Sequence, residues 1–375
     1  MVIALLIFIF IRPFIASLAF PFLNQAWALL LLGLALLWFG RTRPSFEKEP
    51  SIYYPLTLFI AALLISTVFA QNKTTSFFEL YKYINGAALL LLGMTFTRQQ
   101  KLKVIRCLVS AAFVISMLAA YQYFFGFRHL LNYLAAQNIT DTFTIEYITS
   151  RRVFFPFVTP NIFAGYMAML AFVSLYLEKG RWLILPLSLA LVFAKSLSGL
   201  ASFAAGLGVY LLVRGGSKKK KALAGLGLLG IMTVIMWLRM ATLKQHLHPA
   251  FSTIMRLSYW HDTLKIIGSH LLVGIGPGNF ILMKSRFAHN SYLQIWAETG
   301  IGGIVCLVWL VIAVTRKALK QTSVSTHKNV IAALLAAHCA FLAHNLFDFS
   351  FFLPEVSCLW WLIMGMLVTD LPATA

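Results

Sequence analysis

Long apolar runs, separated by short clusters of Lys and Arg, constrain the fold of this 375-residue chain more than any other feature. Hydrophobic residues make up 60% of the sequence and charged residues 11%, whereas a soluble domain carries about 25% charged residues. An apolar segment of about 20 residues spans a bilayer as a helix, because a helix satisfies its own backbone hydrogen bonds in lipid. We therefore expect an all-α, polytopic transmembrane helical bundle.

The apolar stretches predict about 12 spans within a single integral membrane domain covering residues 1–375. The spans are expected near residues 2–20, 26–40, 55–70, 80–97, 104–125, 160–178, 182–195, 199–213, 222–238, 290–315, 329–349 and 356–370. Several of these runs are short for a perpendicular crossing.

Lys and Arg predict which side of the membrane each loop occupies. With the N-terminus on the cytoplasmic side, more than half of the 31 basic residues fall in short cytoplasmic loops. These residues are Arg41, Arg43, Lys48, Arg98, Lys101, Lys103, Arg106, Lys179, Arg181, Arg214, Lys218–Lys221, Arg316, Lys317, Lys320 and Lys328. In this orientation the segments 126–157 and 239–289 face outward.

The large outward loop 239–289 is basic, although outward loops normally carry few Lys and Arg. Against the single acid Asp262 it holds Arg239, Lys244, Arg256, Lys265, Lys284 and Arg286. This charge indicates an anionic ligand such as phosphate or pyrophosphate, with anionic outer-leaflet lipid as the alternative. Apolar residues at helical spacing over 251–272 predict an amphipathic helix along the membrane surface, and the guanidinium of Arg256 within it suits phosphate recognition.

The segment AHNSYLQIWAETGIGG (288–303) places His289 at the mouth of an apolar helix, directly before Asn290. The positive end of the helix dipole favours an anion at this point. A histidine there can act as a general base or donate a hydrogen bond to a phosphate oxygen. We therefore expect a functional role for His289.

Glu298 is an ionisable residue at membrane depth, which is by default a functional hypothesis. At about 100° per residue Glu298 points away from His289, whereas Gly300 lies on the same face as His289. We therefore expect Glu298 to hold the bundle together rather than to form a catalytic dyad with His289. Its predicted partners are backbone donors or one of the bases Arg12, Lys82 and Lys195.

Two other segments carry candidate residues. Arg151 and Arg152 precede an aromatic stretch, and adjacent arginines at a membrane entrance suit a pyrophosphate, with interfacial anchoring as the alternative. His344 and Asp348 can touch at i, i+4 near the outer end of a helix, where we expect a positioning role.

Neither a metal site nor a nucleotide site is predicted. The loop histidines His246, His248, His261 and His270 have no HExxH motif, no cysteine pair and almost no carboxylate near them. The glycine-rich segment VGIGPGNF (273–280) lacks a strand–helix–strand context, so it is interpreted as a tight turn.

Four segments, taken in order, resemble the bacterial O-antigen ligase and O-antigen polymerase superfamily. They are RRVFFPFVTPNIFAGYM, which contains Asn161, RLSYWHDTLKIIGSHLLVGIGPGNF, AHNSYLQIWAETGIGG and HNLFDFSFFLP. The resemblance covers residues 149–366. The chain departs from the family where Phe155, Pro156 and Phe157 replace a Gly-Thr-Phe triplet and where Gly199 replaces an arginine.

The resemblance implies glycosyl transfer on the periplasmic side of the bacterial inner membrane, so that 239–289 is a large periplasmic loop. The implied donor is a glycan on undecaprenyl pyrophosphate, and the acceptor is a hydroxyl of a lipid A-core, another glycan or a protein. No metal, nucleotide or other cofactor is implied, and no nucleic acid partner is expected.

Within this interpretation His289 and Arg256 are the expected catalytic residues, and Arg239 is the alternative to Arg256. The residues expected to bind pyrophosphate are Arg151, Arg152, Arg256 and Arg286. The residues expected to support the site are Asn161, Asn290, Glu298, Gly300 and Asp348.

Three other functions stay open beside the ligase. A polymerase that extends the carrier-linked glycan needs the same leaving group as a ligase. A transporter of the lipid-linked glycan would distribute basic residues through the spans, whereas this chain concentrates them at the outer mouth. A non-enzymatic scaffold gives no reason for the surroundings of His289.

Overall fold

The computed structural model describes residues 1–44, 49–138, 141–177, 179–215, 217–240, 249–324 and 328–369. These residues form helices joined by turns, and among them the only extended pairing is an isolated bridge between Leu282 and Ser285. The prediction of an all-α fold is confirmed. The chain divides into two compact units, and the single domain over 1–375 stays a prediction.

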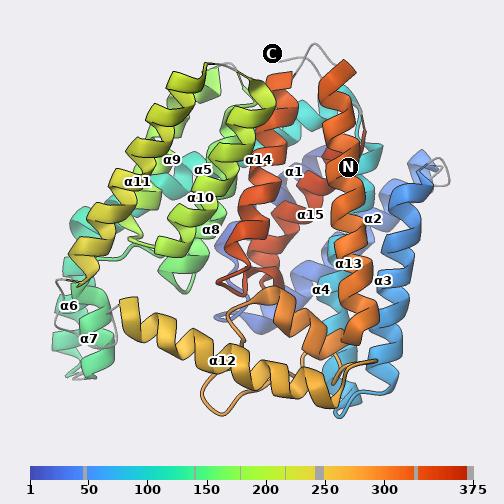
Figure 1. Cartoon of the computed structure of the whole chain (residues 1–375), viewed down its shortest axis with the longest axis horizontal. Coiled ribbons are helices and arrows are strands. Elements are labelled where there is room, and N and C mark those ends of the chain that lie inside the picture. Colours follow the sequence, from blue (N-terminus) through green and yellow to red (C-terminus); the bar gives the residue numbers. More distant parts are fainter. Residues whose placement is uncertain are drawn as a thin grey trace. The chain divides into compact units, whose positions relative to one another are not determined.

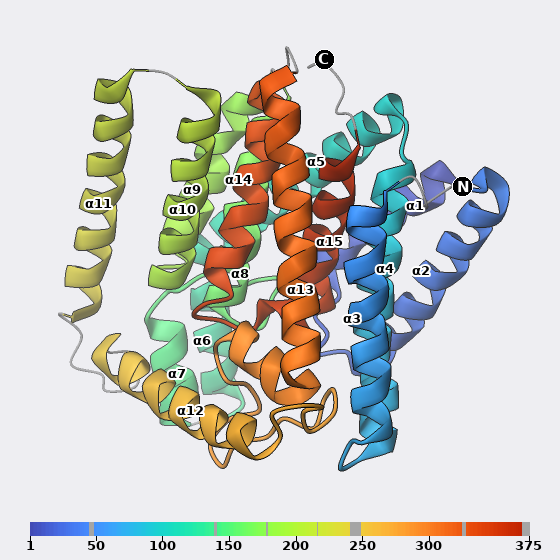
Figure 2. The same cartoon turned by 45° about the vertical axis from the view of Figure 1, so that its right-hand side comes forward.

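The first unit comprises Met1–Val104, Arg256–Ile331 and Asn345–Ala373. Its elements are α1 (Val2–Ile11), η1 (Arg12–Phe14), α2 (Pro21–Thr42), α3 (Pro50–Val68), α4 (Lys73–Thr95), most of α12 (Pro249–Ser269), α13 (Ser291–Val324), η6 (Ser350–Phe352) and α15 (Pro354–Val368). In this unit α15 and α2 pack against α4, and α13 packs along α3, as Figures 1 and 2 both show.

The second unit comprises Ile105–Met255 and Ala332–His344. It contains most of α5 (Arg98–Tyr121), a π-helical turn (Gln122–Gly126), α6 (Phe127–Ala136), α7 (Thr142–Thr149), α8 (Pro160–Ser174), η4 (Lys179–Leu183), α9 (Ile184–Phe193), α10 (Leu197–Arg214), α11 (Lys218–Met240) and most of α14 (Lys328–His344). In it α8 packs against both α9 and α10, and α11 packs against α10.

Every predicted span contains a helix, but the number of spans is not confirmed. Within the described ranges, five helical segments are long and apolar enough to cross a membrane: Pro21–Thr42, Pro50–Val68, Arg98–Ala136, Leu197–Arg214 and Ser291–Thr322. Other apolar helices, such as α8, α9 and α15, have only 10–17 residues. The sequence therefore locates the apolar helices, whereas the number of about 12 crossings stays a prediction.

Both segments expected to face outward contain helices. The segment 126–157 carries α6 and α7, which the interpretation as a loop did not anticipate. The helix predicted over 251–272 is present as α12, and it lies across the direction of α13 and α3 in both views (Figures 1 and 2).

Helix α13 is broken at Gly300, whose φ of 67° and ψ of −174° are not helical. The break releases two backbone carbonyls from the helix. The Ala297 oxygen accepts from the Ile275 amide at 2.9 Å, and the Glu298 oxygen accepts from the Gly276 amide at 2.9 Å. Because the helix is not regular through Gly300, the predicted stripe that joins Gly300 to His289 is wrong.

The glycine-rich segment 274–278 fits closely against this break. Gly274, Gly276 and Gly278 all have positive φ. A Cβ on Gly274 would lie 2.4 Å from the Glu298 backbone, so only glycine allows this approach. Asn279 fixes the end of the segment, because its amide donates to Ser76 Oγ at 2.7 Å and its oxygen accepts from the Asn72 amide at 3.1 Å. The predicted turn therefore supplies the amide donors for the carbonyl groups that the broken helix releases.

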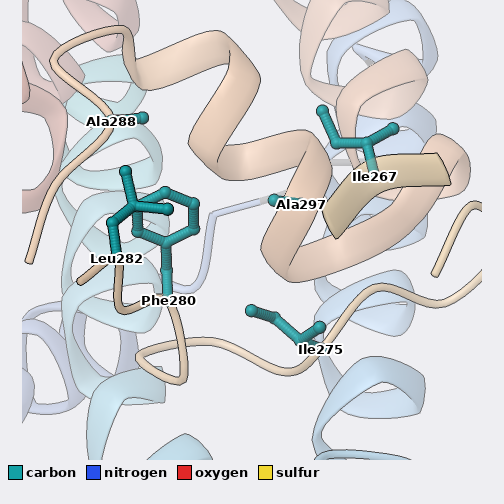
Figure 3. Packing of buried hydrophobic residues seen from close by; sticks show 6 residues of the cluster. All are labelled: Ile267, Ile275, Phe280, Leu282, Ala288 and Ala297. Carbon is teal, nitrogen blue, oxygen red and sulfur yellow. The ribbon is translucent and has the colours of Figure 1, made fainter. Parts of the chain in front are cut away.

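An apolar cluster holds the segment 271–290 in place. Figure 3 shows its six buried residues, which come from α12, from the segment and from α13: Ile267, Ile275, Phe280, Leu282, Ala288 and Ala297. Removing such side chains from water is the main favourable contribution to packing outside the lipid. The cluster thus fixes the path of the chain just before His289.

The break at Gly300 predicts a difference between two neighbouring glycines. Gly300→Ala would place a Cβ 2.1 Å from the Leu272 carbonyl oxygen at a positive φ, whereas a Cβ on Gly302 meets nothing within 4 Å. A strained backbone of this kind costs about 1–3 kcal/mol. We expect Gly300→Ala to lower the thermal unfolding midpoint of the detergent-solubilised protein by several degrees, with Gly302→Ala as the matched control. Equal midpoints for the two variants would contradict the break.

Candidate active site

His289 lies directly before α13 rather than within it. Asn290 caps the helix, since its side-chain oxygen accepts from the Tyr292 amide at 3.0 Å and the Leu293 amide at 3.1 Å. Asn290 therefore fixes the start of α13 directly after His289, and its role in supporting the site stays a prediction. His289 itself adopts a φ of 52°, a conformation that is uncommon outside glycine and that is often found at functional sites.

The His289 ring is held between two aromatic rings. Tyr259 of α12 stacks on it at 5.7 Å between centroids, and Phe349 meets it edge-on at 5.0 Å. The Nδ1 atom is buried, and no hydrogen-bond partner for it is found in the described part of the chain. A buried polar atom of this kind indicates a position that a ligand can satisfy.

Arg256 and Asp348 place opposite charges beside this imidazole. Burial lowers the pKa of His289 from 6.5, the Arg256 charge adds to this effect, and the Asp348 carboxylate opposes it. The imidazole is therefore neutral at pH 7. Burial also lowers the pKa of Arg256 from 12.5 while Asp348 raises it, and a guanidinium stays charged under such conditions. The Arg256 Nε atom has no hydrogen-bond partner among the described residues.

Asp348 is positioned by the turn between α14 and η6. Its carboxylate accepts from the Phe349 amide at 2.7 Å, and its backbone oxygen accepts from Ser291 Oγ at 3.1 Å. Asn345 joins the same turn to α13, because its side-chain oxygen accepts from Ser291 Oγ at 2.6 Å and from the Phe351 amide at 2.8 Å. Helix α14 ends at His344, so Asp348 lies beyond the helix and the i, i+4 spacing of a helix does not describe this pair, whose positioning role stays a prediction.

Glu298 has neutral side-chain partners. Gln294 donates to Glu298 Oε1 at 3.0 Å, the Tyr83 hydroxyl donates to Oε2 at 3.3 Å, and the Gly278 backbone amide contributes a further hydrogen bond. The predicted backbone donor is therefore present, and of the predicted bases the charge of Lys82 acts on the Glu298 carboxyl group, although Lys82 forms its ion pair with Glu79. Those bases are bound elsewhere: Arg12 to Glu355, Lys82 to Glu79 and Lys195 to the Ser150 oxygen.

The second unit holds its own group of cations. Arg152 donates to Asn161 Oδ1 at 3.1 Å and to the Ala194 oxygen at 3.2 Å, so the two predicted residues Arg152 and Asn161 are in contact. Ser196 donates to the same Asn161 oxygen at 2.8 Å. Arg151 is exposed, and its charge and that of Arg152 both act on Lys195. Cations gathered in this way favour a bound anion.

Sequence reasoning missed several residues of these groups. Tyr259 and Asn345 gave no signal beyond their place in the motifs, because an aromatic or amide side chain is common in any segment. The sequence indicates Lys195 only as a possible partner of Glu298. In the structure Lys195 lies just before α10, where the charges of Arg151 and Arg152 act on it.

Some predicted residues are not part of the His289 site as described. Arg286 is exposed and lines a separate cavity. The side chain of Arg239, like His246 and His248, lies outside the described residues. His261 and His270 are on or next to α12, and no group of three metal-ligating side chains is found in the described part of the chain.

These features define an apolar helical membrane protein with a guanidinium and a neutral imidazole gathered outside its candidate membrane spans. Residues 182–308 match the family model described as O-antigen ligase, and the resemblance to this family is thereby confirmed. The matched region includes Arg256, His289, Glu298 and Gly300, whereas Arg151, Arg152, Asn161 and Asp348 lie outside it. A comparison with curated proteins gave no match. Members of the family are membrane enzymes of glycosyl transfer.

The charges around His289 predict opposite effects of two substitutions. Asp348→Asn removes the charge that raises the pKa of His289, so this pKa should fall further. Arg256→Gln removes a charge that lowers it, so the pKa should rise toward 6.5. Both shifts can be followed by NMR titration of histidine-labelled protein, with exposed His261 as an internal reference. Shifts of the same sign in both variants would contradict the arrangement.

Proposed function

We propose that this protein is a glycosyltransferase of the O-antigen ligase type. It transfers a glycan from undecaprenyl pyrophosphate to an acceptor hydroxyl, of lipid A-core or a related molecule, on the periplasmic side of the inner membrane. The observation that carries the proposal is the neutral imidazole of His289 beside the charged guanidinium of Arg256, within the region that matches the family.

The imidazole of His289 suits removal of the acceptor proton, and the guanidinium of Arg256 suits departure of the diphosphate. The acceptor oxygen attacks the anomeric carbon, and the bond from that carbon to the diphosphate oxygen breaks. The neutral imidazole of His289 takes the proton of the acceptor hydroxyl, and Asp348 stabilises the resulting imidazolium. Arg256 stabilises the negative charge that develops on the departing diphosphate.

The remaining predicted anion-binding residues are proposed in supporting roles. Arg151 and Arg152, together with Lys195, form a cationic group that suits a phosphate, and Asn161 orients Arg152. Arg286 is exposed at the edge of a polar cavity in the first unit and offers a further positive charge.

A polymerase is the second candidate, because extension of the carrier-linked glycan uses the same leaving group. The two activities differ in product, since a ligase leaves the glycan on an acceptor and a polymerase leaves a longer glycan on the carrier. A transporter of the lipid-linked glycan is less well supported, because it gives His289 no chemical task.

Substitution of the two central residues should abolish transfer. Loss of a general base typically costs about 10²–10⁴-fold in rate. We expect His289→Ala and Arg256→Ala to lose at least this much when purified protein receives an undecaprenyl-pyrophosphate glycan and an acceptor. The exposed residues His261 and Lys265 of α12 provide the matched controls His261→Ala and Lys265→Ala, which should keep full activity. Full activity in both central variants would overturn the mechanism.

Transfer should also survive chelation. Because guanidinium groups are assigned the role of balancing the diphosphate charge, excess chelator and omission of nucleotide should leave the rate unchanged. The measurement compares initial rates of glycan transfer with and without chelator. A loss of activity that Mg²⁺ restores would contradict this assignment.

A further inference from the structure

A polar cavity in the first unit is not used by the mechanism above. Its volume is about 210 Å³, and it lies between the start of α2, the early part of α4, the segment 278–287 and α13. Phe287 lines it and stacks on Phe349 at 3.9 Å, and the edge of Phe349 contacts the His289 ring. Two aromatic rings, those of Phe287 and Phe349, therefore lie between the cavity and the imidazole.

The cavity is lined by groups of both signs. Glu79 and Lys82 form an ion pair at 2.5 Å, and Glu298 and Arg286 add one carboxyl and one guanidinium group. A diphosphate would face the Glu79 carboxylate here, which repels it and already occupies Lys82. A neutral ligand rich in hydroxyl groups avoids this repulsion, since each hydroxyl both donates and accepts hydrogen bonds.

Several polar groups of the cavity are deeply buried. Glu298 and Gln294 are 2% and 3% exposed, and Ser17 is 7% exposed. No partner for Ser17 Oγ is found within the described ranges. Such a group commonly has a hydrogen-bond partner, so its position in the wall indicates a ligand.

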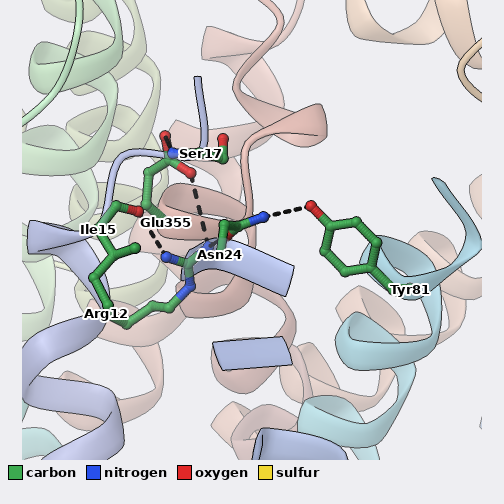
Figure 4. Close-up of polar contacts among 6 residues, drawn as sticks. All are labelled: Arg12, Ile15, Ser17, Asn24, Tyr81 and Glu355. Atoms are coloured by element: carbon green, nitrogen blue, oxygen red, sulfur yellow. Dashed lines mark hydrogen bonds and ion pairs between the residues drawn. The ribbon is translucent and has the colours of Figure 1, made fainter. Parts of the chain in front are cut away.

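A buried network of hydrogen bonds and one ion pair holds the Tyr81 hydroxyl in place, as Figure 4 shows. Arg12 pairs with Glu355 and donates to the Asn24 side-chain oxygen, and the Asn24 amide in turn donates to the Tyr81 hydroxyl. Because that hydroxyl oxygen already accepts a hydrogen bond, its proton is free to be donated to a ligand. Tyr81 lines the cavity at the end of this network.

Aromatic side chains complete the wall. Phe280, Phe287 and Phe352 line the cavity beside the polar groups. Aromatic faces pack against the apolar C–H faces of a pyranose ring, while the polar groups bind its hydroxyls. The volume is below the range of roughly 300–1,000 Å³ that is typical of pockets for drug-sized ligands, so a single ring fits better than an oligosaccharide.

We propose that this cavity binds one neutral sugar unit of the glycan substrate, with Glu79, Lys82, Tyr81 and Ser17 contacting its hydroxyl groups. That the bound sugar belongs to the glycan substrate rests on the proposed function. That the cavity binds a sugar at all does not rest on it. Its place two aromatic rings from His289 makes the cavity a determinant of which sugar is accepted.

The test measures binding without transfer. Free glucose and galactose serve as probes in saturation-transfer difference NMR with the full protein in detergent. We expect saturation of the sugar protons with the unaltered protein. Loss of a hydrogen bond to a charged group weakens binding by roughly tenfold or more, so Glu79→Gln, and Ser17→Ala to a smaller extent, should reduce the signal.

The matched control is Glu49→Gln, because Glu49 also pairs with a lysine, Lys317, in the same unit but does not line the cavity. Thermal unfolding of each variant separates lost binding from lost folding. Absence of saturation for both sugars, equal signals in Glu79→Gln and Glu49→Gln, or displacement of the sugars by inorganic pyrophosphate would overturn the proposal. Sugar binding that depends on the cavity in a protein without transfer activity would instead overturn only the proposed function.

Discussion

The break in α13 at Gly300 is the constraint on which the rest of the candidate site depends. A helix that stops and restarts must satisfy the backbone groups that it releases, and at membrane depth water cannot do so. The amides of Ile275 and Gly276 take the released carbonyls of Ala297 and Glu298, and Ser66 Oγ donates to the Glu298 oxygen at 2.6 Å. This pairing fixes the segment 271–290 against α13, so it also fixes the approach of the chain to His289.

Two kinds of site then arise on one rigid framework in the first unit. Around His289, burial and the charge of Arg256 favour a neutral imidazole, which suits proton transfer to the ring. In the adjoining cavity Glu79 and Lys82 pair with each other, and Gln294 donates to Glu298, which suits a neutral ligand. The aromatic pair Phe287 and Phe349 belongs to both regions and separates their different electrostatic environments.

Much of the fold follows from the pattern of apolar residues. Every predicted span contains a helix, and α12 occurs where periodicity predicts it, because an apolar run in lipid has few alternatives to a helix. The number of crossings does not follow, since α8, α9 and α15 are apolar yet short, and an apolar run has the same composition whether it crosses lipid or is buried in protein. The prediction of a regular helix through Gly300 is wrong, because helix propensity depends on neighbouring residues and does not include the distant segment around Gly276 that pairs with the break.

Composition, motif order and side-chain chemistry can be read directly from the chain, so they predict the membrane class, the resemblance to the O-antigen ligase family and the chemical types of the central residues. His289, Arg256 and Asn290 could be singled out in this way. The partners of these and neighbouring residues are visible only in the folded chain: Tyr259 and Phe349 around the imidazole, Gln294 and Tyr83 on Glu298, and Lys195 beside Arg152. Hydrogen bonds and charges act over a few ångströms in space, and the residues that they join here are separated by as many as 215 positions in the chain.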